Sequence, residues 1–105
     1  MWISMKTEAT ACPIGKVVEL LGDSCSILIV RDLLEGPKRY SDLQNSLQAS
    51  SRTLAKKLKL LEHEGLINHK KPLGTKSHGM YRLSKKGAAF EKVADAMRAY
   101  GKKYL

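Results

Sequence analysis

The chain has few cysteines and no long hydrophobic run. Cys12 and Cys25 are too few for a disulfide framework and lack the C-x-x-C spacing of zinc or redox sites, so we expect reduced thiols at rest. No apolar stretch approaches the roughly 18 residues that span a bilayer. The opening MWISMKTEATACP lacks the apolar segment of a signal peptide. We therefore expect a cytoplasmic protein.

Catalytic and metal-binding patterns are also missing. The sequence contains no nucleophile elbow, no phosphate-binding loop and no carboxylate pair whose spacing predicts a shared cleft. His63, His69 and His78 have no ligand spacing with the cysteines. These absences argue against an enzyme, and we predict neither a metal nor a cofactor.

Basic charge is abundant and lies in the second half of the chain. The 105 residues, enough for one domain, carry a formal charge of +9. Residues 1–49 have a net charge of −1, and residues 50–105 have a net charge of +10. Clustered cations gain affinity for a polyanion by releasing counterions from its phosphates. The distribution favours nucleic acid as the partner, although acidic lipid would satisfy the charge alone.

Apolar periodicity and helix-stop residues divide the chain into short elements. CPIGKVVELLG predicts a helix from Pro13 to a stop at Gly22, and SCSILIVRDLLEG predicts a second, apolar on all sides and therefore central. Ser41 is a good cap for a short third helix. LINHKK and MYRLS predict a β-hairpin around the turn-rich PLGTKSHG, and Ser84 can cap a last helix.

The stretch SSRTLAKKLKLLEHEGLI predicts a fourth helix with two unlike faces. One face has the spacing of a buried stripe: Leu54, Leu58 and Leu61. The opposite face gathers cations: Arg52, Lys56, Lys59 and His63. Ser50 or Ser51 can cap the start, and Gly65 can stop the helix. A solvated lysine-rich helix is the alternative to a binding surface.

The order of these elements predicts the fold class. It is that of a winged helix-turn-helix: mainly α, with about five helices and a two-stranded β-hairpin wing. The second helix of such a pair enters the major groove of double-stranded DNA. We expect a single domain at 1–105, with a tail at 1–11, a winged-helix core at 12–83 and a C-terminal dimerisation helix at 84–105.

Four motifs in this order resemble the HxlR-type regulators, winged-helix transcription factors related to the MarR group. They are CP at Cys12, LEGPKRYSDL (34–43), LKLLEHEGLI (58–67) and YRLSKKG (81–87). The resemblance covers nearly the whole chain. It implies a homodimeric prokaryotic regulator on a palindromic operator, with the terminal helices joining the subunits. The chain departs from the family at Cys25, where tryptophan is usual, and near His78, where an arginine is frequent.

We predict DNA contacts on three segments. The residues are Lys38, Arg39, Tyr40 and Ser41 before the third helix; Ser50, Ser51, Arg52, Thr53, Lys56 and Lys57 on the fourth; and Lys70, Lys71, Lys76 and His78 on the wing. Arg52 is the candidate for reading guanine, because its guanidinium can bond O6 and N7 together. Tyr40 could equally lie at the edge of the core, and a solvated hairpin is the alternative for the wing.

Apolar residues at both ends of the chain predict a subunit interface. They are Trp2, Ile3, Phe90, Val93, Met97, Tyr100 and Tyr104. A two-fold dimer would place two basic helices about 34 Å apart, one turn of DNA, which predicts a palindromic site.

Cys12 is a candidate sensor of oxidants or electrophiles. It stands at a helix start, where the dipole can lower the pKa of a thiol, and some members of the resembling family use the matching cysteine in this way. A small residue in a subunit contact is the alternative, and Cys25 is expected in the core.

Two other functions remain open for the protein: an architectural DNA-binding protein without sequence preference, and a winged-helix protein-interaction module.

Overall fold

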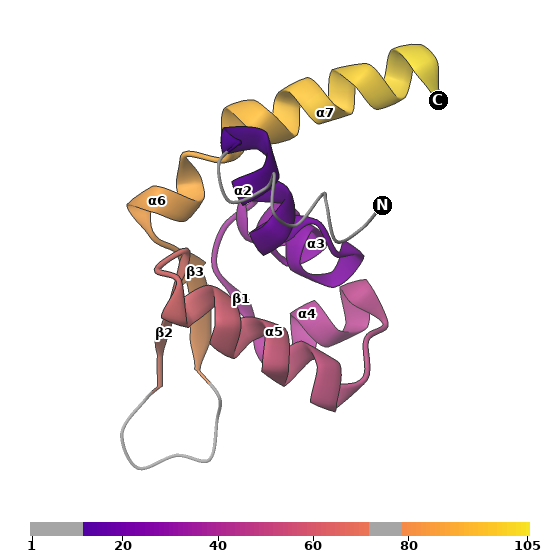
Figure 1. The fold of residues 1–105 in the computed structure, drawn as a ribbon. Helices are drawn as coiled ribbons and strands as arrows, with labels where there is room; N and C mark the ends of the chain where they lie inside the picture. The colour runs from indigo at the N-terminus through magenta and orange to yellow at the C-terminus, as the bar shows by residue number, and fades with distance from the viewer. Residues whose placement is uncertain (1–11, 72–78) are drawn as a thin grey trace.

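The computed structural model describes residues 12–71 and 79–105 and has the predicted winged helix-turn-helix architecture (Figure 1). Its elements are α2 (Pro13–Leu21), α3 (Ser24–Leu33), β1 (Lys38–Arg39), α4 (Tyr40–Leu47), α5 (Ser51–His63), β2 (Ile67–Lys70), β3 (Met80–Leu83), α6 (Lys85–Ala88) and α7 (Glu91–Tyr104). Helices α4 and α5 are the helix-turn-helix pair, and β2 and β3 form the wing. The predicted fold class is confirmed.

The sheet has one strand more than the sequence predicts. The predicted hairpin is present, with Ile67 of β2 opposite Leu83 of β3. On its other side β3 pairs with β1, where Lys38 lies opposite Tyr81, so the strand order is β1-β3-β2. A strand of two residues is too short to display the alternation that identifies strands in a sequence.

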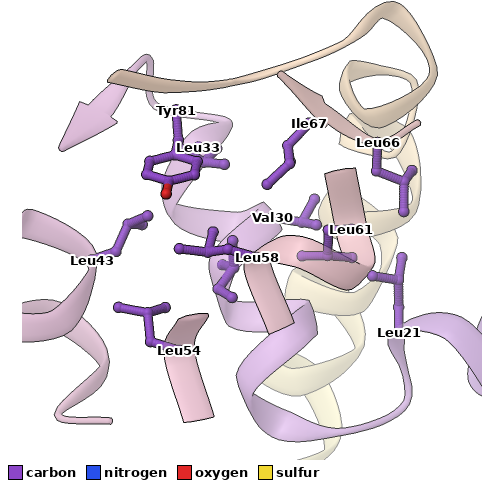
Figure 2. Close-up of a cluster of buried hydrophobic side chains, with 11 residues drawn as sticks. Leu21, Val30, Leu33, Leu43, Leu54, Leu58, Leu61, Leu66, Ile67 and Tyr81 are labelled. Carbon is purple, nitrogen blue, oxygen red and sulfur yellow. The ribbon is translucent and has the colours of Figure 1, made fainter. Parts of the chain in front are cut away.

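The core lies around α3, which contacts α2, α4, α5 and β3. Side chains from all of these elements converge there, as Figure 2 shows for most of them. The buried apolar residues are Leu21, Ile29, Val30, Leu33, Leu43, Leu54, Leu58, Leu61, Leu66, Ile67 and Tyr81. The predicted central position of the second helix is therefore confirmed.

Helix α4 begins one residue before the predicted cap, Ser41. Its first residue is Tyr40, and the residue before it, Arg39, has extended backbone. The carboxylate of Asp42 accepts the backbone N–H of Arg39 at 3.0 Å and so satisfies a donor at the start of the helix. The prediction that Ser41 caps this helix is wrong, because a carboxylate inside the first turn closes it instead.

The predicted last helix is broken into α6 and α7. Ser84 caps α6 as predicted, accepting the N–H of Gly87 at 3.1 Å, and its hydroxyl also donates to the carbonyl of Gly65 just after α5. Gly87 lies so close to this segment that a Cβ there would stand 2.1 Å from the carbonyl oxygen of Leu66. Helix α6 is therefore held against the end of α5, and α7 starts in a new direction (Figure 1).

Helix α2 buries less of its apolar face than its sequence suggests. Only Leu21 is buried. Ile14, Val17 and Val18 are 75%, 42% and 43% exposed. The apolar surface left outside the core is thus larger than the sequence predicts.

Replacing Gly87 by alanine is expected to destabilise the fold by about 1–3 kcal/mol, because the added methyl group would collide with the backbone of Leu66. Urea unfolding measures the difference. Gly101→Ala is the matched control: nothing lies within 4 Å of the corresponding Cβ, so stability should hold or rise slightly. Equal unfolding midpoints for the wild type and Gly87→Ala would contradict the close contact.

Candidate nucleic-acid interface

Helix α5 presents the two faces that its sequence predicts. Leu54, Leu58 and Leu61 are 0%, 2% and 0% exposed. The side chains on the opposite face are all exposed: Arg52, Lys56, Lys59 and His63. In Figure 1, α5 and the wing strands lie toward the lower side of the molecule, away from α7. The cationic face is thus open to a large partner.

The start of α5 is capped by Ser50 rather than Ser51. The Ser50 hydroxyl oxygen accepts the backbone N–H of Thr53 at 3.1 Å, and its hydrogen is donated to the Thr53 hydroxyl oxygen at 3.0 Å. Ser51, Arg52 and Thr53, the first three residues of the helix, are exposed. Because the positive end of the helix dipole lies at the same place, the turn is suited to an anion such as a phosphate.

Tyr40 lies at the edge of the core, which is one of the two positions that its sequence context allows. Its ring is partly buried and packs against the core. Its hydroxyl reaches the start of α5, where it donates to the Ser51 carbonyl at 2.8 Å and lies 2.8 Å from the Ser51 hydroxyl oxygen. The contact joins the two helices of the pair, and the sequence alone offered no signal for it.

Lys57 differs from the other predicted contacts because it turns toward α3. Its ammonium lies 3.5 Å from the carboxylate of Asp23, and its side chain is 26% exposed. Asp23 caps α3 by accepting the N–H of Ser26 at 2.9 Å. Burial opposes ionisation of Asp23, but the hydrogen bond from Ser26 and the charge of Lys57 outweigh it and hold the pKa of Asp23 below its usual range. Lys57 therefore ties α5 to the start of α3.

The predicted contacts around the start of α4 lie at the start of the helix pair. Arg39 and Ser41 are exposed. Lys38 is half-buried, and its ammonium forms an ion pair with Glu35 at 3.2 Å. Arg39 is consequently the cation of this segment most accessible to a partner.

The wing contributes a further basic surface. Lys70 and Lys71 are exposed where the chain leaves β2. Two other predicted contacts, Lys76 and His78, lie outside the described residues. Lys70 and Lys71 thus add positive charge to the side of the molecule on which α5 and the wing strands lie (Figure 1).

The two cysteines are in different environments. Cys12 is free and exposed at the residue before α2. Cys25 is half-buried against the core and lines a hollow of about 270 Å³ that also reaches Ser50 and Thr53. Burial raises the pKa of the Cys25 thiol, and the charge of Asp23 raises it further. Cys12 is therefore the more accessible of the two thiols.

The second exposed surface is apolar. On α7, no residue is buried, and the exposed large side chains are Val93, Met97, Tyr100 and Tyr104. Phe90 is half-buried and packs against the core. Trp2 and Ile3, predicted to join this surface, lie outside the described residues. The structure instead adds Ile14, Val17 and Val18 of α2, which sequence reasoning had not assigned to a surface.

Within residues 12–71 and 79–105, no helix is long and apolar enough to cross a membrane. In the same part of the chain, His, Cys, Asp and Glu side chains do not gather in groups of three that could hold a metal ion.

The chain is similar over most of its length to proteins described as HTH-type transcriptional regulators. It is 35% identical to the uncharacterized HTH-type transcriptional regulator sll1512 of Synechocystis over 90% of this chain and 70% of that protein. It is 30% identical to the HTH-type transcriptional regulator YodB of Bacillus subtilis over 90% of this chain and 87% of that protein.

Solved structures agree with these sequence similarities. The candidate transcription factor PA1607 matches with a TM-score of 0.79 and 36% identity over 90% of this chain and 66% of that one, so this chain spans about two thirds of PA1607. Reduced YodB matches with a TM-score of 0.76 and 29% identity, over 90% of this chain and 94% of the YodB chain. YodB is also known in a quinone-bound form. A MarR-family regulator from Porphyromonas gingivalis, 24% identical, has the same fold with a TM-score of 0.81. The match covers 90% of this chain and 93% of that one.

A model of the HxlR-like helix-turn-helix family matches residues 20–105. The two relatives of this chain named above, sll1512 and YodB, are regulators of transcription and not enzymes. The chain therefore belongs to the HxlR-like helix-turn-helix family.

Proposed function

We propose that this chain regulates transcription by binding double-stranded DNA sequence-specifically, as a homodimer on a palindromic operator. The observation that carries the proposal is the exposed cationic face of α5, directly after the turn from α4. A helix of this kind fits the major groove. Arg52 would bond one guanine, whereas Lys56 and Lys59 would meet phosphates and carry affinity without sequence information.

Helix α7 supports the dimer. It has 14 residues, none of them buried, and a helix of this length is marginal in water without a partner. Its exposed apolar side chains, together with those of α2, would be covered by a second copy in a two-fold arrangement. Such a dimer brings two copies of α5 to one DNA duplex, about 34 Å apart, which is the spacing of a palindromic site.

Arg52→Ala is expected to cost about 1–3 kcal/mol at a single base position, whereas Lys71→Ala should weaken binding to all sequences alike. The test begins with selection of genomic DNA fragments by the purified wild-type protein at about 0.15 M salt, which identifies an enriched site. Each variant is then titrated against the enriched site and its single-base variants. A uniform loss on all DNA with both variants would overturn the base-reading role of Arg52 and favour an architectural protein. A wild type without any DNA affinity would favour a protein-interaction module.

Met97→Glu is expected to weaken dimerisation by about 3 kcal/mol, because a carboxylate would be buried in a largely apolar interface. Met97 is 50% exposed on the apolar face of α7. Ala99→Glu adds the same charge on the opposite, exposed face of α7 and should leave the dimer intact. Sedimentation equilibrium measures the dimer dissociation constant of the wild type and of both variants. A wild type that is monomeric, or a Met97→Glu variant that stays dimeric, would contradict the proposed interface.

We also infer that Cys12 makes the regulator responsive to electrophiles, since its thiol is exposed and the relative YodB binds a quinone. An adduct at Cys12 would stand at the start of α2, which bears part of the proposed subunit surface. A quinone should lower the DNA affinity of the wild type about tenfold or more. Each tenfold loss of affinity corresponds to about 1.4 kcal/mol of binding free energy.

Cys12→Ser should abolish this response, and Cys25→Ser should retain it because Cys25 is half-buried with a raised pKa. DNA titrations with and without quinone provide the readout. An undiminished response in Cys12→Ser would remove Cys12 as the sensor.

A further inference from the structure

Tyr40 connects three elements of the half of the molecule proposed to bind DNA. It is the first residue of α4 and directly follows β1, where Lys38 pairs with Tyr81 of the wing strand β3. Its hydroxyl contacts both the carbonyl and the hydroxyl of Ser51, each at 2.8 Å. Ser51 is the first residue of α5. The Tyr40 side chain thus joins the start of α4, which directly follows β1, to the start of the proposed recognition helix.

The hydrogen atoms at this contact allow two arrangements. Tyr40 and Ser51 have one hydroxyl hydrogen each. When Tyr40 donates to the Ser51 carbonyl, the Ser51 hydroxyl donates to Tyr40 and has no hydrogen left for a ligand. When Tyr40 donates to the Ser51 hydroxyl oxygen instead, the Ser51 hydrogen can point outward. A phosphate diester oxygen carries no hydrogen and only accepts, so a bound phosphate selects the second arrangement.

We propose that Tyr40 is a positioning residue for DNA, which holds the Ser51 hydroxyl at the start of α5 and directs its hydrogen to a backbone phosphate. The inference rests on the proposed function. Ser51 is exposed, and the positive end of the α5 dipole lies at the same point. A hydroxyl that accepts one hydrogen bond also becomes a stronger donor. Tyr40 therefore acts through Ser51 and does not itself touch the DNA.

The surroundings of Tyr40 hold its ring independently of the hydroxyl. The ring packs against the core. Nearby, Tyr81 is buried and stacks on His69 with the ring centroids 4.2 Å apart. Burial raises the pKa of Tyr81, and the charge of Glu62 and the neighbouring Tyr40 raise it further. Phenylalanine in place of Tyr40 keeps the packing of the ring and removes only the hydroxyl.

A double-mutant cycle on DNA affinity tests the proposal, with Tyr40→Phe, Ser51→Ala and the double variant titrated against the fragment that the wild type enriches. Each single variant should lose about three- to tenfold in affinity, and the double variant should lose no more than Ser51→Ala alone. The slope of affinity against salt should stay unchanged, because no charge is removed. Ser46→Ala, which removes an exposed hydroxyl elsewhere on α4, is the control and should bind as the wild type does.

The outcomes separate this inference from the proposed function. A wild type that enriches no fragment would overturn the proposed function, and the role of Tyr40 with it. If the wild type binds and Tyr40→Phe binds equally well, Tyr40 only packs and the inference fails. Losses that multiply in the double variant would also overturn it, since Tyr40 would then act independently of Ser51. Thermal unfolding of each variant confirms that affinities refer to folded protein.

Discussion

Three leucines of α5, Leu54, Leu58 and Leu61, lie in the core with almost no exposure, and the rest of the proposed DNA-binding surface depends on this contact. Each buried leucine contributes about 1.5–3 kcal/mol. Because they share one face of the helix, their burial forces the opposite face toward solvent, with Arg52 among its cations. A helix with the same charges but no such stripe would present them in no fixed direction.

Polar contacts then fix the rotation and the start of α5. Lys57 pairs with Asp23 at the beginning of α3, and Tyr40 contacts Ser51. At the far end of the helix, α6 packs against the backbone of Leu66. Helix α5 is thus held along its leucine stripe and at both ends, which suits an element that must meet DNA with a defined register.

The two proposed interfaces lie on opposite sides of the molecule, with α5 and the wing on one side and α7 on the other (Figure 1). Helix α2 connects them, because it bears exposed apolar residues and contacts α3, which in turn contacts α5. Cys12 stands at the start of α2. The proposed response at Cys12 would therefore reach α5 through α2 and α3, with Leu21 the buried residue of α2.

The parts of this structure that the sequence predicted are those with a periodic signal. The leucine stripe of α5 and the order of helices and hairpin identified the fold, because burial of one face leaves a repeat of 3.6 residues. Contacts between distant segments leave no such repeat. The pairing of Lys38 with β3, the bond from Tyr40 to Ser51 and the turn of Lys57 toward Asp23 each depend on the tertiary arrangement.

Exposure was the other property that the sequence described poorly. The pattern of Ile14, Val17 and Val18 is that of a core-facing helix, yet these side chains lie in solvent in the single chain. An apolar face has the same periodicity whether its own core or a second copy covers it.

Hydroxyl-radical footprinting of the fragment that the protein enriches from genomic DNA would show whether two copies of α5 bind one site. A two-fold dimer should protect two segments related by an inverted repeat, with centres about ten base pairs apart. A single protected segment, or uniform protection that extends along the fragment as protein is added, would contradict a two-fold dimer that reads sequence through α5.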